Sequence, residues 1–147
     1  MMIAIYLVLG IWVSLVNVLP SFAEENPKVV LLAQRIIEAK SSAEAASSLL
    51  QASDSYFKEH KYDDCVMFLK SLAQKRSDLT PAADYYIALS RFRQLKYLED
   101  TQGWDEYFSK GNDYRQEFES AALKAASVLP VTSRERLEAK VLLWRFH

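Results

Sequence analysis

The sequence predicts an all-α protein in which antiparallel helical hairpins stack as a short α-solenoid. Of its 147 residues, only three are glycine and four are proline, which is too few for the many tight turns of an all-β chain. Apolar residues recur three and four positions apart over long stretches, which is typical of amphipathic helices. Two similar stretches, SYFKEHKYDD at 55–64 and SRFRQLKYLE at 90–99, lie 35 residues apart. A constant spacing of this size indicates stacked supersecondary units.

The first 23 residues carry no charge and divide the chain into two parts. Residues 3–19 are almost wholly apolar, and Ser21 and Ala23 then form a small-residue pattern that predicts cleavage of a signal peptide after Ala23. Residues 24–147 then form the helical domain in the periplasm or outside the cell. Two alternatives stay open: an uncleaved anchor, because the apolar run nearly spans a bilayer, and a buried core helix. With an anchor, the domain faces the periplasm from the inner membrane.

The first three helices of the domain have clear limits. Pro27 is suited to the first turn of a helix that ends near Lys40. Ser41 and Glu44 form a capping box that opens a second helix, and residues 59–61 separate it from a third. The predicted inner faces consist of the following residues: Val29, Val30, Leu32, Ala33, Ile36 and Ile37; Ala45, Ala46, Leu49, Leu50, Ser53, Tyr56 and Phe57; Tyr62, Cys65, Val66, Leu69, Leu72 and Ala73.

The second half of the domain repeats this plan with a longer hairpin. Thr80 is the predicted cap of a helix with Pro81 in its first turn. Lys96–Tyr97 is expected at the turn that Lys61–Tyr62 occupies in the first hairpin, and Gly103 is expected to break the following helix. A helical period then continues to about Val128. A second capping box, Thr132 with Glu135, opens a last helix with an apolar stripe of Leu137, Val141 and Trp144.

These units resemble the tetratricopeptide repeat family over residues 46–110. The family's small residue within the first helix matches Ser53 and Ala88. Its aromatic near the end of that helix matches Tyr56 with Phe57 in the first unit and Phe92 in the second. Its tyrosine opening the second helix matches Tyr62 and Tyr97, its next small residue matches Cys65 but not Asp100, and its bulky residue matches Leu69 and Trp104. Two departures are the missing leading tryptophan and the missing turn glycine, which is replaced by His60 and Leu95. A third unit is indicated near Ser133, because Arg145-Phe146-His147 echoes Arg91-Phe92-Arg93.

The resemblance implies a scaffold that binds a protein or peptide in a helical groove. In this family the first helices of the hairpins line the groove, which makes Asp54, Lys58, Tyr85 and Arg93 the candidate partner-binding residues. A generic α-solenoid or helical bundle is the alternative architecture. Two other functions stay open: a membrane-anchored structural subunit of an envelope assembly, and an accessory repeat domain of a longer protein.

No pattern in the sequence indicates catalysis, a metal or a cofactor. The net charge of −1 favours neither nucleic acid nor anionic lipid, so membrane contact is expected only through residues 3–19 if they are uncleaved. Cys65 is the single cysteine and is expected in the core, and His60 and His147 are too few for a metal site. The paired acids 63–64, 99–100 and 105–106 are interpreted as first-turn residues of helices. The aromatic run 104–118 is interpreted as core, although a ligand platform is the alternative.

The last helix lacks a second helix to cover its apolar stripe. We therefore expect either that the chain is the amino-terminal part of a longer protein, with the repeat domain incomplete at its C-terminus, or that this helix docks against another copy.

Overall fold

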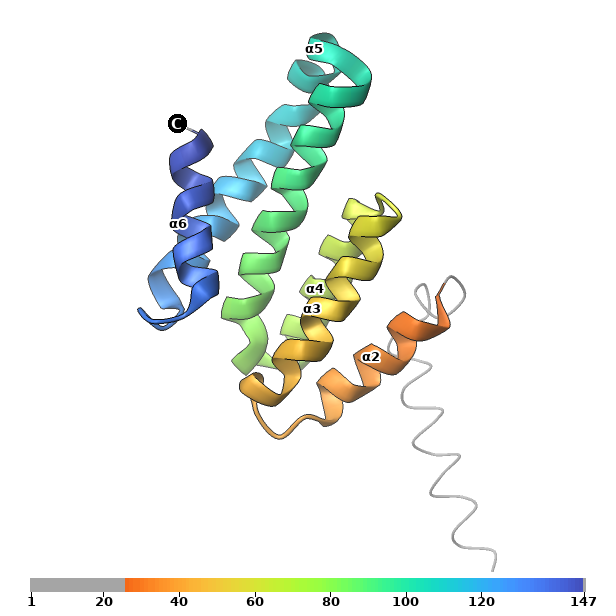
Figure 1. Ribbon diagram of the computed structural model, residues 1–147, viewed down its shortest axis with the longest axis vertical. Helices are drawn as coiled ribbons and strands as arrows, with labels where there is room; N and C mark the ends of the chain where they lie inside the picture. The colour runs from red at the N-terminus through yellow and green to blue at the C-terminus, as the bar shows by residue number, and fades with distance from the viewer. Residues whose placement is uncertain (1–25, 147) are drawn as a thin grey trace, which may run out of the picture.

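The computed structural model describes residues 26–146, which hold α-helices, one short 3₁₀ turn and no strand (Figure 1). The elements are α2 (Pro27–Glu38), α3 (Ser42–Lys58), α4 (Tyr62–Lys75), η1 (Ser77–Leu79), α5 (Thr80–Val128) and α6 (Arg134–Phe146). The prediction of an all-α fold is confirmed for this part of the chain. The predicted signal segment, its cleavage after Ala23 and the anchor alternative lie outside it. Within residues 26–146, no helix is both long and apolar enough to cross a bilayer.

The first three helices begin and end where the sequence predicts. Asn26 caps α2 by accepting a hydrogen bond from the Lys28 backbone N–H (3.1 Å), and Pro27 is its first residue. The Ser41 hydroxyl accepts from the Glu44 N–H (3.2 Å), as a capping box requires. The Glu44 carboxylate, however, accepts from the N–H of Lys40 (2.7 Å) and not of Ser41. The box is therefore closed one residue further out.

Helix α5 reverses direction at Gly103, so it is a hairpin in itself (Figure 1). Gly103 has a φ of 80°, a region that glycine enters without steric cost. Contacts pair the two halves in antiparallel order: Arg91 with Glu117, Phe92 with Phe118, and Leu95 with Gly111. The predicted break at Gly103 is confirmed.

The predicted turn at Lys96–Tyr97 is wrong, because the helix continues through it to residue 102. Residues 95–102 contain neither glycine nor proline. Lys96 instead forms ion pairs with Glu99 (2.9 Å) and Asp100 (3.6 Å), three and four residues on, which support a helix. The first residue that favours a break is Gly103, about two turns later.

Tyr62 and Tyr97 consequently occupy different positions, which contradicts their match to one position of the repeat motif. Tyr62 is the first residue of α4 and is 7% exposed, whereas Tyr97 lies within α5 and is 36% exposed. The two rings are neighbours, with centroids 6.2 Å apart. The similarity of the two Lys-Tyr pairs is therefore one of sequence and not of place in a hairpin.

Two predicted caps are also displaced by one residue. Thr80 is the first residue of α5 and not its cap, because η1 leads directly into the helix and leaves Leu79 at the cap position. At α6 the cap is Ser133, whose hydroxyl accepts from the Arg136 N–H (3.2 Å), and not Thr132. Serine and threonine are both good caps, so the sequence alone did not discriminate between adjacent candidates.

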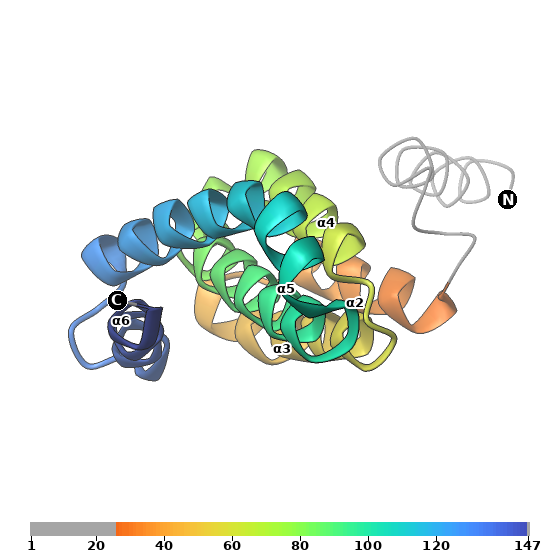
Figure 2. The same cartoon turned by 90° about the horizontal axis from the view of Figure 1, so that it is seen from above.

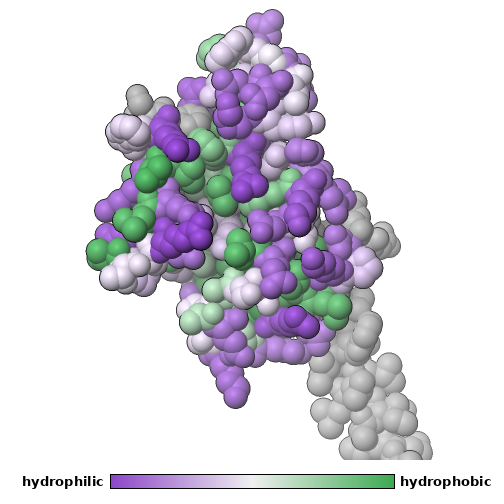
Figure 3. All heavy atoms as spheres, viewed as in Figure 1, coloured by the Kyte–Doolittle hydropathy of each residue, from purple (hydrophilic) through white to green (hydrophobic). Residues whose placement is uncertain are grey.

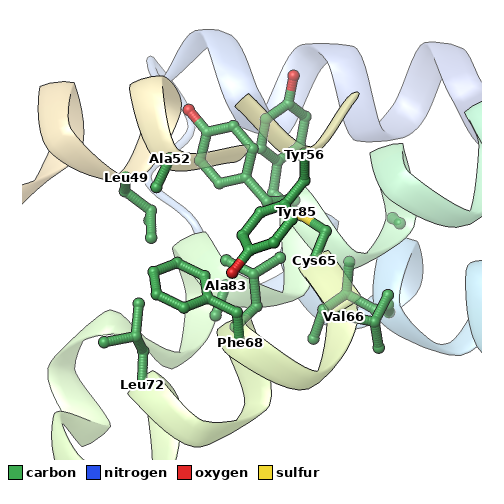
Figure 4. Packing of buried hydrophobic residues seen from close by; sticks show 14 of the residues in the cluster. Leu49, Ala52, Tyr56, Cys65, Val66, Phe68, Leu72, Ala83 and Tyr85 are labelled. Carbon is green, nitrogen blue, oxygen red and sulfur yellow. The ribbon is translucent and has the colours of Figure 1, made fainter. Parts of the chain in front are cut away.

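The helices form two rows, with α3, the residue 80–102 half of α5 and α6 in one row, and α4 and the 104–128 half of α5 in the other (Figure 2). The core lies between these rows. Leu49, Ala52, Tyr56, Cys65, Val66, Phe68, Leu72, Ala83 and Tyr85 meet there from α3, α4 and α5 (Figure 4). The inner faces predicted for the first three helices are buried or half-buried in this core, except that Ala46 and Leu50 are exposed.

A buried arginine joins the two rows. Arg91 of α5 forms ion pairs with Asp63 of α4 and with Glu117 of the other half of α5, and Lys70 of α4 also pairs with Glu117. The Arg91 guanidinium lies 4.8 Å from the ring centre of Tyr114. Burial by itself favours the neutral form of Glu117, but the hydrogen bonds from Lys70 and Arg91 lower the pKa of its carboxyl below the ordinary value.

Candidate functional site

A pocket of about 320 Å³ lies where the turn between α3 and α4 meets α5. Its lining consists of Phe57, His60, Tyr62, Phe92, Arg93, Lys96, Tyr97 and Asp100. We call it the His60 pocket. The part of α5 beyond residue 95 supplies two of its three charged groups, Lys96 and Asp100, so the pocket depends on that helix not turning at residue 96. Its size is at the lower end for ligand pockets and suits one or two side chains of a partner.

His60 sits in the turn with a φ of 56°, in the left-handed region that costs a residue with a side chain. The imidazole compensates through contacts: it stacks on Tyr97 (4.6 Å between centroids, 26° between planes) and shares a 3.0 Å hydrogen bond with the Tyr62 hydroxyl. A strained residue held by its surroundings is a frequent feature of functional sites.

Arg93 supplies an available positive charge to the pocket. Its guanidinium lies 4.6 Å from the ring centre of Phe57, a cation–π contact. Within residues 26–146, Arg93 forms no ion pair, whereas the other pocket cation, Lys96, is paired with Glu99 and Asp100. Arg93 is exposed, so its N–H groups can donate to an incoming acceptor.

The hydroxyl of Tyr62 stays protonated at neutral pH. Burial raises the pKa of Tyr62, and the charge of Arg93 opposes this shift. Tyr62 can therefore donate or accept a hydrogen bond, but it does not act as a base. The pocket offers aromatic faces, hydroxyls and one available guanidinium, which are groups for binding.

Of the four predicted partner-binding residues, Arg93 alone lines this pocket. The exposed Lys58 follows the lining residue Phe57 at the end of α3. Asp54 lies one turn earlier on α3 and is half-buried. Its charge reaches Tyr86 of α5: burial and the charges of Glu135, Asp54 and Glu138 raise the pKa of Tyr86 to about 12. Asp54 therefore faces α5 and not the open solvent.

Tyr85 lies away from the pocket and has a structural contact instead. It is buried, and its hydroxyl donates to the Glu138 carboxylate of α6. Burial, followed by this hydrogen bond and the charge of Glu138, raises the pKa of Tyr85. A partner that contacted Tyr85 directly would have to displace α6.

Four lining residues are not predicted as site residues from the sequence: His60, Tyr62, Phe92 and Tyr97. The available signal is the repeated Lys-Tyr pair, because two tyrosines each follow a lysine 35 residues apart. The sequence predicts that these tyrosines occupy equivalent turns, whereas in the structure they are neighbours.

The other reactive groups identified in the sequence lie in the core, at the start of a helix or in ion pairs. Cys65 is fully buried, as predicted, and burial raises the pKa of its thiol to about 12. Asp63 and Asp64 lie in the first turn of α4, as predicted, although Asp63 also pairs with Arg91. The first-turn interpretation is wrong for Glu99–Asp100, which lie inside α5 and pair with Lys96.

The core interpretation of the aromatic run 104–118 is correct for Phe118 and wrong for its beginning. Phe118 is fully buried, but Trp104 is 60% and Phe108 65% exposed. With Tyr107 they form a cluster whose ring centroids are 5.5–5.9 Å apart. The helical period located the apolar residues, but no other helix among residues 26–146 covers them at this end of α5 (Figure 1).

Comparison of the chain with models of known protein families, with curated proteins and with solved structures finds no match.

Proposed function

We propose that this chain is an exported binding scaffold that holds a segment of another polypeptide at the His60 pocket. One observation supports this most directly: Arg93 is exposed, lies on the face of Phe57 and has no acidic partner among the described residues. A guanidinium in this setting suits a carboxylate, and the surrounding rings suit an aromatic or aliphatic side chain. The favoured ligand is a peptide that places an acidic residue next to an apolar one.

The charges around the pocket favour a peptide over a nucleic acid. Aromatic rings with an arginine can also bind single-stranded bases. Asp100 lines this pocket, however, and Glu59 and Glu99 lie beside it in the sequence, so a phosphate backbone would meet several carboxylates. A peptide needs to place only one carboxylate against Arg93, whereas a nucleic acid carries a phosphate charge at every nucleotide.

A peptide-display selection tests this proposal. The full-length chain and its Arg93→Ala variant are each used as bait for a library of random peptides. We expect the native chain to enrich peptides with adjacent apolar and acidic residues, and Arg93→Ala to bind them about tenfold or more weakly. The matched control is Arg35→Ala, an exposed arginine on α2 outside the pocket. Enrichment that Arg93→Ala leaves unchanged would refute the proposal.

A second candidate function is a structural subunit of an envelope assembly. It is favoured by the exposed apolar side chains at the tip of α5 and on α6.

The molecular mass of the chain after expression tests whether it is exported and cleaved. Cleavage after Ala23 removes about 2.5 kDa, whereas an uncleaved anchor leaves the mass unchanged. An unshortened chain that stays in the membrane fraction would favour the structural subunit.

A further inference from the structure

Helix α6 presents an apolar stripe that nothing in the described part of the chain covers. Leu137, Val141 and Trp144 follow one another at helical spacing, and Trp144 is 80% exposed. Lys140 and Arg145 flank the stripe, are exposed and have no ion pair within residues 26–146. We call these five residues the α6 face. Figure 3 shows apolar side chains in this region edged by hydrophilic ones.

A second exposed apolar surface lies at the reversal of α5 and has the opposite charge. Trp104, Tyr107 and Phe108 form its centre, and we call this cluster the aromatic tip. Residues 96–113 around it contain five acidic residues and two lysines, a net charge of −3. Asp105 and Asp113 are exposed and, among the described residues, have no ion pair. By the same count, α6 has four basic and two acidic residues, a net charge of +2.

We propose that the aromatic tip of one copy docks on the α6 face of a second copy, so that the chains associate head to tail. Both surfaces are exposed in the same molecule, so one copy does not satisfy its own pair. Tryptophan and other aromatic side chains are enriched at the centres of protein interfaces, with charges at the rim. Here both centres are apolar and contain an exposed tryptophan, and the rims are opposite in sign.

The charges select this pairing over the alternatives. A symmetric contact between two α6 faces would place Lys140 and Arg145 near the same cations of the partner. A symmetric contact between two tips would likewise bring acidic residues together, and the acidic tip is repelled by an anionic membrane surface. Only the heterologous pairing brings each surface to the opposite charge. Heterologous contacts build rings when the rotation closes and filaments when it does not.

Charge reversal in sedimentation velocity tests the proposal, using the full-length chain at low salt. We expect the native chain to associate with rising concentration. Lys140→Glu with Arg145→Glu should weaken association at least about fivefold, and so should Asp105→Lys with Asp113→Lys. The two double variants mixed together should associate again, because the reversed tip of one then meets the reversed α6 face of the other. All four changes in one chain should also restore association.

Other results would overturn it. A monomer at every concentration would do so, as would a tip reversal that leaves association intact, which would indicate contact between two α6 faces. Binding of the native chain to vesicles of anionic phospholipid through the α6 face, without association in solution, would indicate a membrane instead. Trp104→Ala with Phe108→Ala should also weaken association, whereas Leu31→Ala, an equally exposed apolar residue on α2, should not. Arg93→Ala should leave association unchanged, which separates this contact from the proposed peptide site.

Discussion

Replacing His60 separately by glycine and by alanine should reverse the usual order of stability between these two residues. Both changes remove the imidazole, its stacking on Tyr97 and its hydrogen bond to Tyr62. Only alanine keeps a Cβ at a φ of 56°, where it costs about 1–2 kcal/mol. Glycine lowers the free energy of unfolding by about 0.4–1 kcal/mol relative to alanine, because it makes the unfolded chain more flexible. We therefore expect His60→Gly to be more stable than His60→Ala by about 1 kcal/mol.

Urea denaturation followed by circular dichroism measures this difference, which corresponds to a shift of about 3–5 °C in melting temperature for a domain of this size. The control is the same pair of changes at Gln116, an exposed position inside α5. There alanine should be the more stable by about 1 kcal/mol, because it is the better helix former. If His60→Ala is as stable as His60→Gly while the Gln116 pair behaves normally, the left-handed turn is not strained and the reasoning fails.

Four further outcomes follow from the buried polar groups. Arg91→Ala should lower the free energy of unfolding by about 2–3 kcal/mol in urea denaturation, a value reduced from that of a fully buried pair because its carboxylate partners are partly exposed. Because the folded pKa of Glu117 is depressed, its contribution is complete above its unfolded pKa of about 4.3 and is lost as pH falls below it. Glu117→Gln should therefore lose less stability than the native chain between pH 6 and pH 3. Tyr85→Phe should cost about 1–2 kcal/mol and increase amide exchange in α6, because the hydrogen bond to Glu138 is lost. Cys65 should resist iodoacetamide at pH 8 in the folded chain and react only in urea, since its pKa is about 12.

Local signals predicted the first half of the domain well. Pro27, Ser41 and the polar break 59–61 act within one turn of the chain, and the helices there begin and end as expected. The apolar stripes of α3 and α4 face each other across a short turn, so the helical period predicted burial for these residues except Ala46 and Leu50. Cys65 was placed in the core for this reason, and the structure confirms it.

The second half was predicted less well because its features depend on which neighbours are present. A helical period identifies an apolar face but does not show whether another element covers it. Trp104 and Phe108 continue the period of Phe118, yet only Phe118 has helices around it. Similarly, the match between Lys61–Tyr62 and Lys96–Tyr97 outweighed the absence of any helix breaker before Gly103.

The continuation of α5 past residue 96 accounts for the His60 pocket and the aromatic tip, two of the three surfaces for which we propose a role. A turn at Lys96–Tyr97 would have ended the helix level with the α3–α4 turn, and Tyr97 and Asp100 would not reach the His60 pocket. The added residues 97–102 extend α5 by nearly two turns, about 9 Å. They place Tyr97 against His60, which supports the strained turn, and they carry Trp104 and Phe108 beyond the neighbouring helices into solvent. The stretch without a breaker between Leu95 and Gly103 is thus the local cause of the pocket and of the exposed tip. These two surfaces, for which we propose a role, arise where the second hairpin departs from the first.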